Sequence, residues 1–154
     1  MRVVIDTNVL VRSTPVSQGG PAREVLERLL SGSHILITSE PLIAEIADVI
    51  QRPGVRRLHG MSDARIAEFI AMLESSSDAF ALPTTMPALV PDDPKDAPVV
   101  ATAIVGRADV LCTRDRHLRH PDVLAVCQAN GIRVLSDIEL LNELRSADAV
   151  DPTT

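Results

Sequence analysis

The sequence contains very few aromatic residues: among 154 residues, Phe69 and Phe80 are present, but tryptophan and tyrosine are absent. A platform of stacked aromatic rings that reads nucleic-acid bases is therefore excluded, and the core must be built from aliphatic side chains. Lysine is equally scarce, because Lys95 is the only one, so arginine carries nearly all the positive charge. The net charge of −6 argues against a protein that coats duplex nucleic acid with a broad basic face.

Cysteines and long apolar runs are also scarce. Cys112 and Cys127 have no metal-binding spacing, and we expect both to be reduced thiols. No stretch approaches the roughly 18 consecutive apolar residues of a membrane span. Asp6 interrupts the first apolar run before that run could serve as the core of a secretion signal. We therefore expect a cytoplasmic protein with no membrane span.

What the sequence does contain is enough apolar material for a folded domain. Hydrophobic residues make up 45% of the chain and charged residues only 23%, which is typical of a globular protein rather than a disordered segment. The length fits one domain of ordinary size. We predict a single domain over residues 1–146, followed by a flexible C-terminal tail over residues 147–154.

Short apolar runs alternate with amphipathic stretches along the chain. The runs predict strands near residues 3–5, 34–37, 80–82, 110–112 and 133–135. The amphipathic stretches predict helices near residues 22–30, 39–51, 62–74, 96–105, 121–129 and 137–144. A loop over 13–21, a basic turn over 52–60 and a proline-rich connection over 83–94 separate them. The fold class is therefore α/β, with a central parallel sheet of about five short strands and helices on both faces.

Four acidic residues lie where such a fold would bring them together. Ligands bind to open α/β sheets beyond the carboxyl ends of the strands, where the strand order reverses. Asp6 ends the first strand, Asp115 follows the fourth strand by three residues, and Asp96 opens a helix that packs on the sheet. Glu45 lies at the edge of the apolar stripe of its helix, whereas Glu40 lies nearly opposite the centre of that stripe.

Each acid also has a purely structural interpretation. Asp96 can cap its helix, Asp115 can be a turn residue, and Glu45 can be a solvated acid that flanks the core. Their coincidence at one sheet edge favours a site, because clustered carboxylates without counter-charge raise one another's pKa and cost stability unless cations bind. Oxygen ligands without cysteine or histidine favour Mg²⁺ or Mn²⁺ over zinc.

At these residues the chain resembles the PIN-domain ribonucleases, in four blocks that occur in the family's order between residue 3 and about residue 118. The blocks are Val4-Ile5-Asp6-Thr7-Asn8-Val9-Leu10, Ser39-Glu40-Pro41-Leu42-Ile43-Ala44-Glu45-Ile46, Asp93-Pro94-Lys95-Asp96 before Val99-Val100-Ala101-Thr102-Ala103, and Ala108-Asp109-Val110-Leu111-Cys112-Thr113-Arg114-Asp115. The chain is also similar to the toxins of bacterial and archaeal toxin–antitoxin pairs of the VapC type.

The resemblance implies an endoribonuclease that cleaves single-stranded RNA with a water molecule activated by Mg²⁺ or Mn²⁺. Its acidic quartet would be Asp6, Glu45, Asp96 and Asp115, acting as metal ligands and catalytic residues. Asn8 and Thr113 would orient ligands, and Asp93 would assist or replace Asp96. A homodimer and a cognate antitoxin protein are the expected partners. Arg114 departs from the family, because many relatives have glycine before the last aspartate.

Arginines at two positions along the chain are candidates to bind RNA phosphates. They lie in the basic turn at Arg52 and after the fourth strand at Arg114 and Arg116, although arginine-rich turns are also common on solvated surfaces. Two alternatives to the nuclease remain. A non-catalytic PIN scaffold would bind only RNA or a protein. A phosphotransferase similar to haloacid dehalogenases would need an aspartate where Asn8 stands and a lysine after Lys95, and the sequence has neither.

Overall fold

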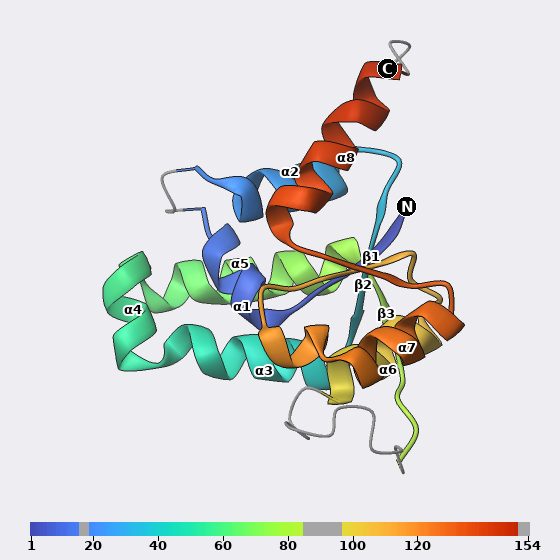
Figure 1. Cartoon of the computed structure of the whole chain (residues 1–154). Coiled ribbons are helices and arrows are strands. Elements are labelled where there is room, and N and C mark those ends of the chain that lie inside the picture. Colours follow the sequence, from blue (N-terminus) through green and yellow to red (C-terminus); the bar gives the residue numbers. More distant parts are fainter. Residues whose placement is uncertain (16–18, 85–96, 151–154) are drawn as a thin grey trace.

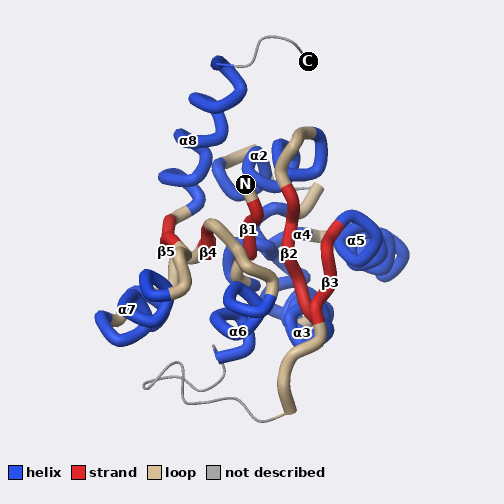
Figure 2. The backbone as a smooth tube through the Cα atoms, turned by 90° about the vertical axis from the view of Figure 1, so that its right-hand side faces the viewer, coloured by secondary structure: helices blue, strands red, loops and turns tan. Residues whose placement is uncertain are grey.

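Five parallel strands form one sheet at the centre of the protein, in the order β3-β2-β1-β4-β5 (Figure 2). This computed structural model describes residues 1–15, 19–84 and 97–150. The strands are β1 (Arg2–Ile5), β2 (Ile35–Ser39), β3 (Ser77–Phe80), β4 (Val110–Cys112) and β5 (Arg133–Leu135). The parallel sheet with its flanking helices confirms the predicted α/β class.

The helices connect the strands and surround the sheet (Figure 1). They are α1 (Thr7–Leu10), α2 (Pro21–Ser31), α3 (Glu40–Gln51), α4 (Pro53–His59), α5 (Asp63–Ser76), α6 (Ala97–Val105), α7 (Pro121–Ala129) and α8 (Asp137–Val150). Two short 3₁₀ helices, η1 (Val11–Ser13) and η3 (Arg116–Arg119), follow α1 and β4. In the described parts of the chain, no helix has both the length and the apolar character needed to cross a membrane.

Both faces of the sheet are buried, which explains why its inner strands are mainly apolar, with Arg2 of β1 and Thr38 and Ser39 of β2 as their polar residues. Successive residues of a strand point to opposite faces. Accordingly, Val3 and Ile5 of β1 belong to a core cluster with α2, α5 and α8, whereas Val4 belongs to a second cluster with α6 and α7. β4 repeats this alternation, with Leu111 in the second cluster. Helix α3 contributes to both clusters.

The register of the sheet aligns the carboxyl ends of its two central strands. Ile5 of β1 lies opposite Cys112 of β4, so the next residues, Asp6 and Thr113, leave the sheet side by side. Because β2 and β3 lie on one side of β1 while β4 and β5 lie on the other, the strand order reverses between β1 and β4. Asp6 therefore lies at the topological switch point, where ligands of α/β proteins bind.

The structure differs from the prediction in several elements, among them the short helix α1, which was not predicted. Residues 53–59, predicted as part of a basic turn, form helix α4, which ends at Gly60 in the left-handed conformation (φ 62°). Strand β3 begins at Ser77 and ends at Phe80, whereas the strand was expected to begin at Phe80. Helix α8 continues past its predicted end at Leu144 to Val150, and in this extension Asp148 forms an ion pair with Arg28 of α2. Residues 147–150 of the predicted tail are thus helical.

Candidate active site

Among the predicted acids within the described residues, Asp6 is the most enclosed, with only 4% of its surface exposed. Its backbone N–H donates to the Cys112 carbonyl (2.9 Å), which extends the pairing of β1 and β4 by one residue. Its own carbonyl accepts from the N–H groups of Val9 and Leu10, so the chain enters α1 directly. The backbone of Asp6 is therefore fixed at the sheet edge by hydrogen bonds of its N–H and of its carbonyl.

The surroundings of Asp6 disfavour its negative charge. Burial, the largest cause, raises the pKa of the Asp6 carboxyl from 3.8 to about 6. A hydrogen bond from Thr113 and another from the Thr7 backbone act in the opposite direction, while the charges of Glu45 and Asp115 raise the pKa further. Glu45 and Asp115 are thus close enough to Asp6 to repel its charge, and a cation placed among them would remove that repulsion.

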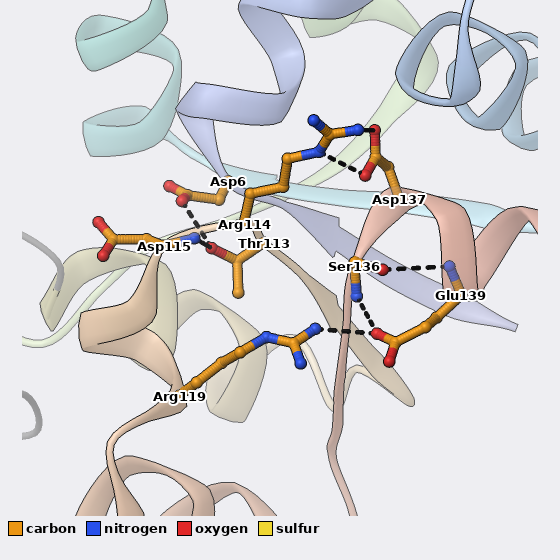
Figure 3. A network of polar contacts seen from close by, with 8 residues as sticks. All are labelled: Asp6, Thr113, Arg114, Asp115, Arg119, Ser136, Asp137 and Glu139. Carbon is orange, nitrogen blue, oxygen red and sulfur yellow. Dashed lines mark hydrogen bonds and ion pairs between the residues drawn. The ribbon is translucent and has the colours of Figure 1, made fainter.

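Thr113 links two of the acids through its hydroxyl group (Figure 3). The Thr113 hydroxyl donates to Asp6 Oδ2 and accepts from the Asp115 backbone N–H, both at 2.9 Å. Asp115 Oδ1 in turn accepts from the His117 backbone N–H at 2.8 Å, which caps η3. Asp6 and Asp115 lie on the same side of Thr113 in Figure 3, so the carboxyl ends of β1 and β4 bring these two carboxylates together.

Glu45 approaches the pair from helix α3. The helix begins at the carboxyl end of β2 and buries Leu42, Ile46 and Ile50, so Glu45 is half-buried beside that stripe while Glu40 is exposed. This confirms the distinction that the helical periodicity predicted. Glu45 belongs to a third element at the same edge of the sheet.

The remaining predicted acids, Asp93 and Asp96, lie outside the described residues. Within the described ranges, no three Asp, Glu, His or Cys side chains already form a group that could hold a metal ion. The predicted acids within the described residues are therefore Asp6, Glu45 and Asp115. The charges of Glu45 and Asp115 both raise the pKa of Asp6.

Asn8, Arg52 and Arg116 lie in different places relative to the acids. Asn8 is exposed on α1, two residues beyond Asp6, and Arg116 is exposed on η3 beside Asp115. Arg52 stands at the far end of α3, where it pairs with Asp48 (2.8 Å) on an open surface. Asn8 and Arg116 are thus exposed near Asp6 and Asp115 in the chain, whereas Arg52 pairs with another acid.

Arg114 makes an ion pair that the sequence did not predict. Its Nε donates to Asp137 Oδ1 (2.6 Å) and its Nη2 donates to Asp137 Oδ2 (2.8 Å), in the two-bond geometry that suits a guanidinium. Asp137, the first residue of α8, is fully buried. Figure 3 shows Arg114 extending away from Asp6 and Asp115 toward α8.

A second link joins the segment after β4 to the same end of α8. Arg119 of η3 donates to Glu139 Oε2 (2.8 Å), and Glu139 also accepts from the Ser136 backbone N–H (2.6 Å). Ser136 Oγ accepts from the Glu139 backbone N–H, which completes a capping box. These bonds hold the pKa of Glu139 at about 2. The Ser136-x-x-Glu139 spacing could have revealed this helix start, but nothing in the sequence indicated the partner of Asp137.

The side chains around Asp6 suit a hard divalent cation. All three acids offer oxygen atoms, which Mg²⁺ and Mn²⁺ prefer. Thr7 Oγ1 is also buried beside Asp6, with no hydrogen-bond partner in the described part of the chain. A bound ion and its water would give this Thr7 oxygen a hydrogen-bond partner and would neutralise the neighbouring Asp6 carboxylate.

Comparison with known proteins identifies the family. A comparison with curated protein sequences gave no match. The family model described as PIN domain matches residues 2–117, which is more than half of the chain. The match includes all three described acids, Thr113 and the parallel strands β1 to β4. The chain therefore belongs to the PIN domain family, whose members are typically nucleases that use divalent metal ions.

Proposed function

We propose that this protein is an endoribonuclease that cleaves single-stranded RNA with the help of Mg²⁺ or Mn²⁺. The observation that carries the proposal is the pair of Asp6 and Asp115, joined by the Thr113 hydroxyl at the switch point of a PIN-domain sheet. A buried carboxylate with a raised pKa beside two other acids lowers the stability of the fold. A function that needs this carboxylate explains its presence.

The proposed site consists of Asp6, Glu45 and Asp115, completed by Asp96 or Asp93 from the segment outside the described residues. A bound Mg²⁺ or Mn²⁺ ion would supply Lewis acidity, activating water and neutralising charge on the phosphodiester. Thr113 keeps Asp6 and Asp115 oriented, because one hydroxyl bonds to both. Burial of Asp6 excludes bulk water from one side of the site, which strengthens its attraction for a cation.

Generic single-stranded RNA, with Mn²⁺ or with chelator, provides the test. We expect cleavage only with metal, and a loss of at least about a hundredfold in Asp6→Asn. Glu45→Gln should also lose most activity. Glu40→Gln is its matched control on the same helix, and it should stay within about twofold of the wild type, as exposed substitutions usually do.

Metal binding gives a readout that does not depend on cleavage. Calorimetric titration with Mn²⁺ should give heat in the wild type and in Glu40→Gln, and little in Asp6→Asn. Cleavage that persists in chelator, or that is equal in Asp6→Asn, would contradict the proposal. RNA binding without cleavage in either condition would favour the non-catalytic scaffold.

We further propose that the nuclease is the toxin of a toxin–antitoxin pair and forms a homodimer. This rests on the resemblance of the four sequence blocks to toxins of that kind. A small neighbouring reading frame, encoding a protein that binds this one and inhibits its cleavage of RNA, would support the toxin role. Light scattering of the purified protein would measure whether it is a dimer.

A further inference from the structure

A cavity of about 730 Å³ is lined by residues of α1, η1 and α4 and by Arg114, while none of the three described acids lines it. Its lining includes Asn8, two residues beyond Asp6, and Arg114, the neighbour of Asp115. The volume falls within the range of about 300–1,000 Å³ that is common for sites of small organic ligands. A single nucleotide belongs to that size class, and Asn8 and Arg114 connect the cavity to the two segments that carry Asp6 and Asp115.

Two guanidinium groups line the cavity, although the whole protein carries −6, and because Asp137 compensates the charge of Arg114, the positive charge of the cavity comes mainly from Arg12. Arg114 lines the cavity while Asp137 holds its Nε and Nη2, so its orientation is fixed and its Nη1 is left over. Arg12, at η1, is exposed and has no ion pair or hydrogen bond within residues 1–15, 19–84 and 97–150. A fixed and an uncommitted arginine beside a nuclease site suit the phosphates of a bound strand.

The opposite wall of the cavity is aliphatic. It includes Val11 and Val55, both half-buried, and Leu58 of α4, which is 88% exposed. So exposed a leucine contributes little to folding, but it can cover the face of a base. The absence of tryptophan and tyrosine from the chain leaves aliphatic groups and arginine planes for this contact.

His59 contributes its ring to the cavity but has no free nitrogen for base recognition. Its Nδ1 accepts from the Met61 backbone N–H (2.9 Å), so its Nε2 donates to the Ile50 carbonyl (2.7 Å). These bonds connect the end of α4 to α3 and hold the aliphatic wall in place. Asn8 is then the exposed polar side chain best placed to touch a base edge.

We propose that this cavity binds a nucleotide of single-stranded RNA next to the cleaved bond, with Arg12 and Arg114 on its phosphates and Leu58 against its base. This inference rests on the proposed function. Because few groups in the cavity can form hydrogen bonds with a base edge, the subsite selects for a flexible single strand and discriminates weakly among the bases.

Fluorescence anisotropy with a labelled single-stranded oligoribonucleotide, in chelator, tests the cavity without cleavage. Arg12→Gln should weaken binding on the order of tenfold. It should also reduce the slope of log affinity against log salt by about 0.7, the value for one phosphate contact on a single strand. Leu58→Ser should weaken binding on the order of threefold while leaving the salt slope unchanged.

Arg57→Gln is the matched control, because Arg57 is an exposed arginine of α4 that does not line the cavity. It should change the affinity much less than Arg12→Gln. Equal effects of the two substitutions, or an unchanged salt slope in Arg12→Gln, would overturn the inference and leave the cavity for another occupant such as a protein side chain. Binding that follows the expected pattern without metal-dependent cleavage would support the cavity while refuting the nuclease, so the two failures are distinguishable.

Discussion

Two carboxylates of this protein, Glu24 and Asp6, have opposite surroundings. Glu24 of α2 accepts from Arg28 (2.9 Å) and from Arg145 of α8 (2.5 and 3.0 Å), which lowers its pKa to about 2. Asp6 is buried near two other acids, which raises its pKa to about 6. The first arrangement favours the ionised carboxylate within the folded chain, whereas the second leaves the charge to be neutralised from outside. The difference separates an acid that joins two helices through arginines from a buried acid whose nearest charged neighbours are also acids.

The largest expected effect is a gain of stability when the charge of Asp6 is removed. The pKa of Asp6 is higher in the folded than in the unfolded chain, so ionisation costs stability as pH rises from about 4 to 6. At pH 7 without metal, Asp6→Asn should raise the free energy of unfolding by up to about 3 kcal/mol. Urea denaturation at several pH values would measure the difference, which should vanish near pH 4.

Divalent metal supplies the control for this prediction. Mn²⁺ should stabilise the wild type by mass action and reduce the advantage of Asp6→Asn. Equal stability of the two proteins at every pH, with and without metal, would show that the buried charge is already compensated by the chain itself.

A smaller loss is expected when the buried partner of Arg114 is neutralised. Asp137→Asn should destabilise the protein by about 2 kcal/mol, less than a fully enclosed pair because Arg114 can be rehydrated. Thermal unfolding would measure the loss. Glu143→Gln is a suitable control, since Glu143 of the same helix pairs with Arg133 on a more open surface. If Glu143→Gln destabilised the protein as much as Asp137→Asn, the two ion pairs would not differ in their contribution to stability.

Thr113→Val should cost about 1 kcal/mol, because the Asp115 N–H loses its acceptor and Asp6 loses its donor. Thr113→Ser keeps the hydroxyl and should retain both metal binding and activity. If Thr113→Val bound Mn²⁺ as tightly as Thr113→Ser, the link between Asp6 and Asp115 would have no role in arranging the site.

The smallest expected effect concerns Glu24. Glu24→Gln should lower stability slightly at neutral pH, and added salt should reduce the loss, because the site is solvent-exposed. The pKa of Glu24 is depressed on folding, so its contribution is present above about pH 4.5 and is lost as pH falls toward 2. The pH dependence should therefore slope in the direction opposite to that of Asp6. Denaturation of both variants across the same pH series would compare them directly.

Much of the fold could be predicted because its signals are local. Strands β4 and β5 and helix α7 were predicted at the bounds that the structure has, since short apolar runs and the proline at position 121 define their ends. Helix α4 was missed because its arginine-rich sequence has no apolar period. Its end is instead held by a long-range bond between the His59 ring and the Ile50 carbonyl, which periodicity cannot reveal.

The candidate site likewise combines features that local sequence signals predict with features that depend on long-range packing. The positions of Asp6 and Asp115 followed from the ends of two strands, and the helical period separated Glu45 from Glu40. The pairing of Arg114 with Asp137 could not be predicted, because it depends on where the first turn of α8 packs against the segment after β4. Whether Asp93 or Asp96 completes the site stays a prediction.

The pairing of β1 with β4 also has a consequence for protein synthesis. Asp6 and the hydroxyl that bonds to it are 107 residues apart in the chain, and β1 needs β4 along one of its edges. A ribosome makes Asp6 almost at once, yet the nascent polypeptide cannot assemble this acid pair until residue 113 has been translated and has emerged. The proposed site therefore stays incomplete during most of the synthesis of the chain.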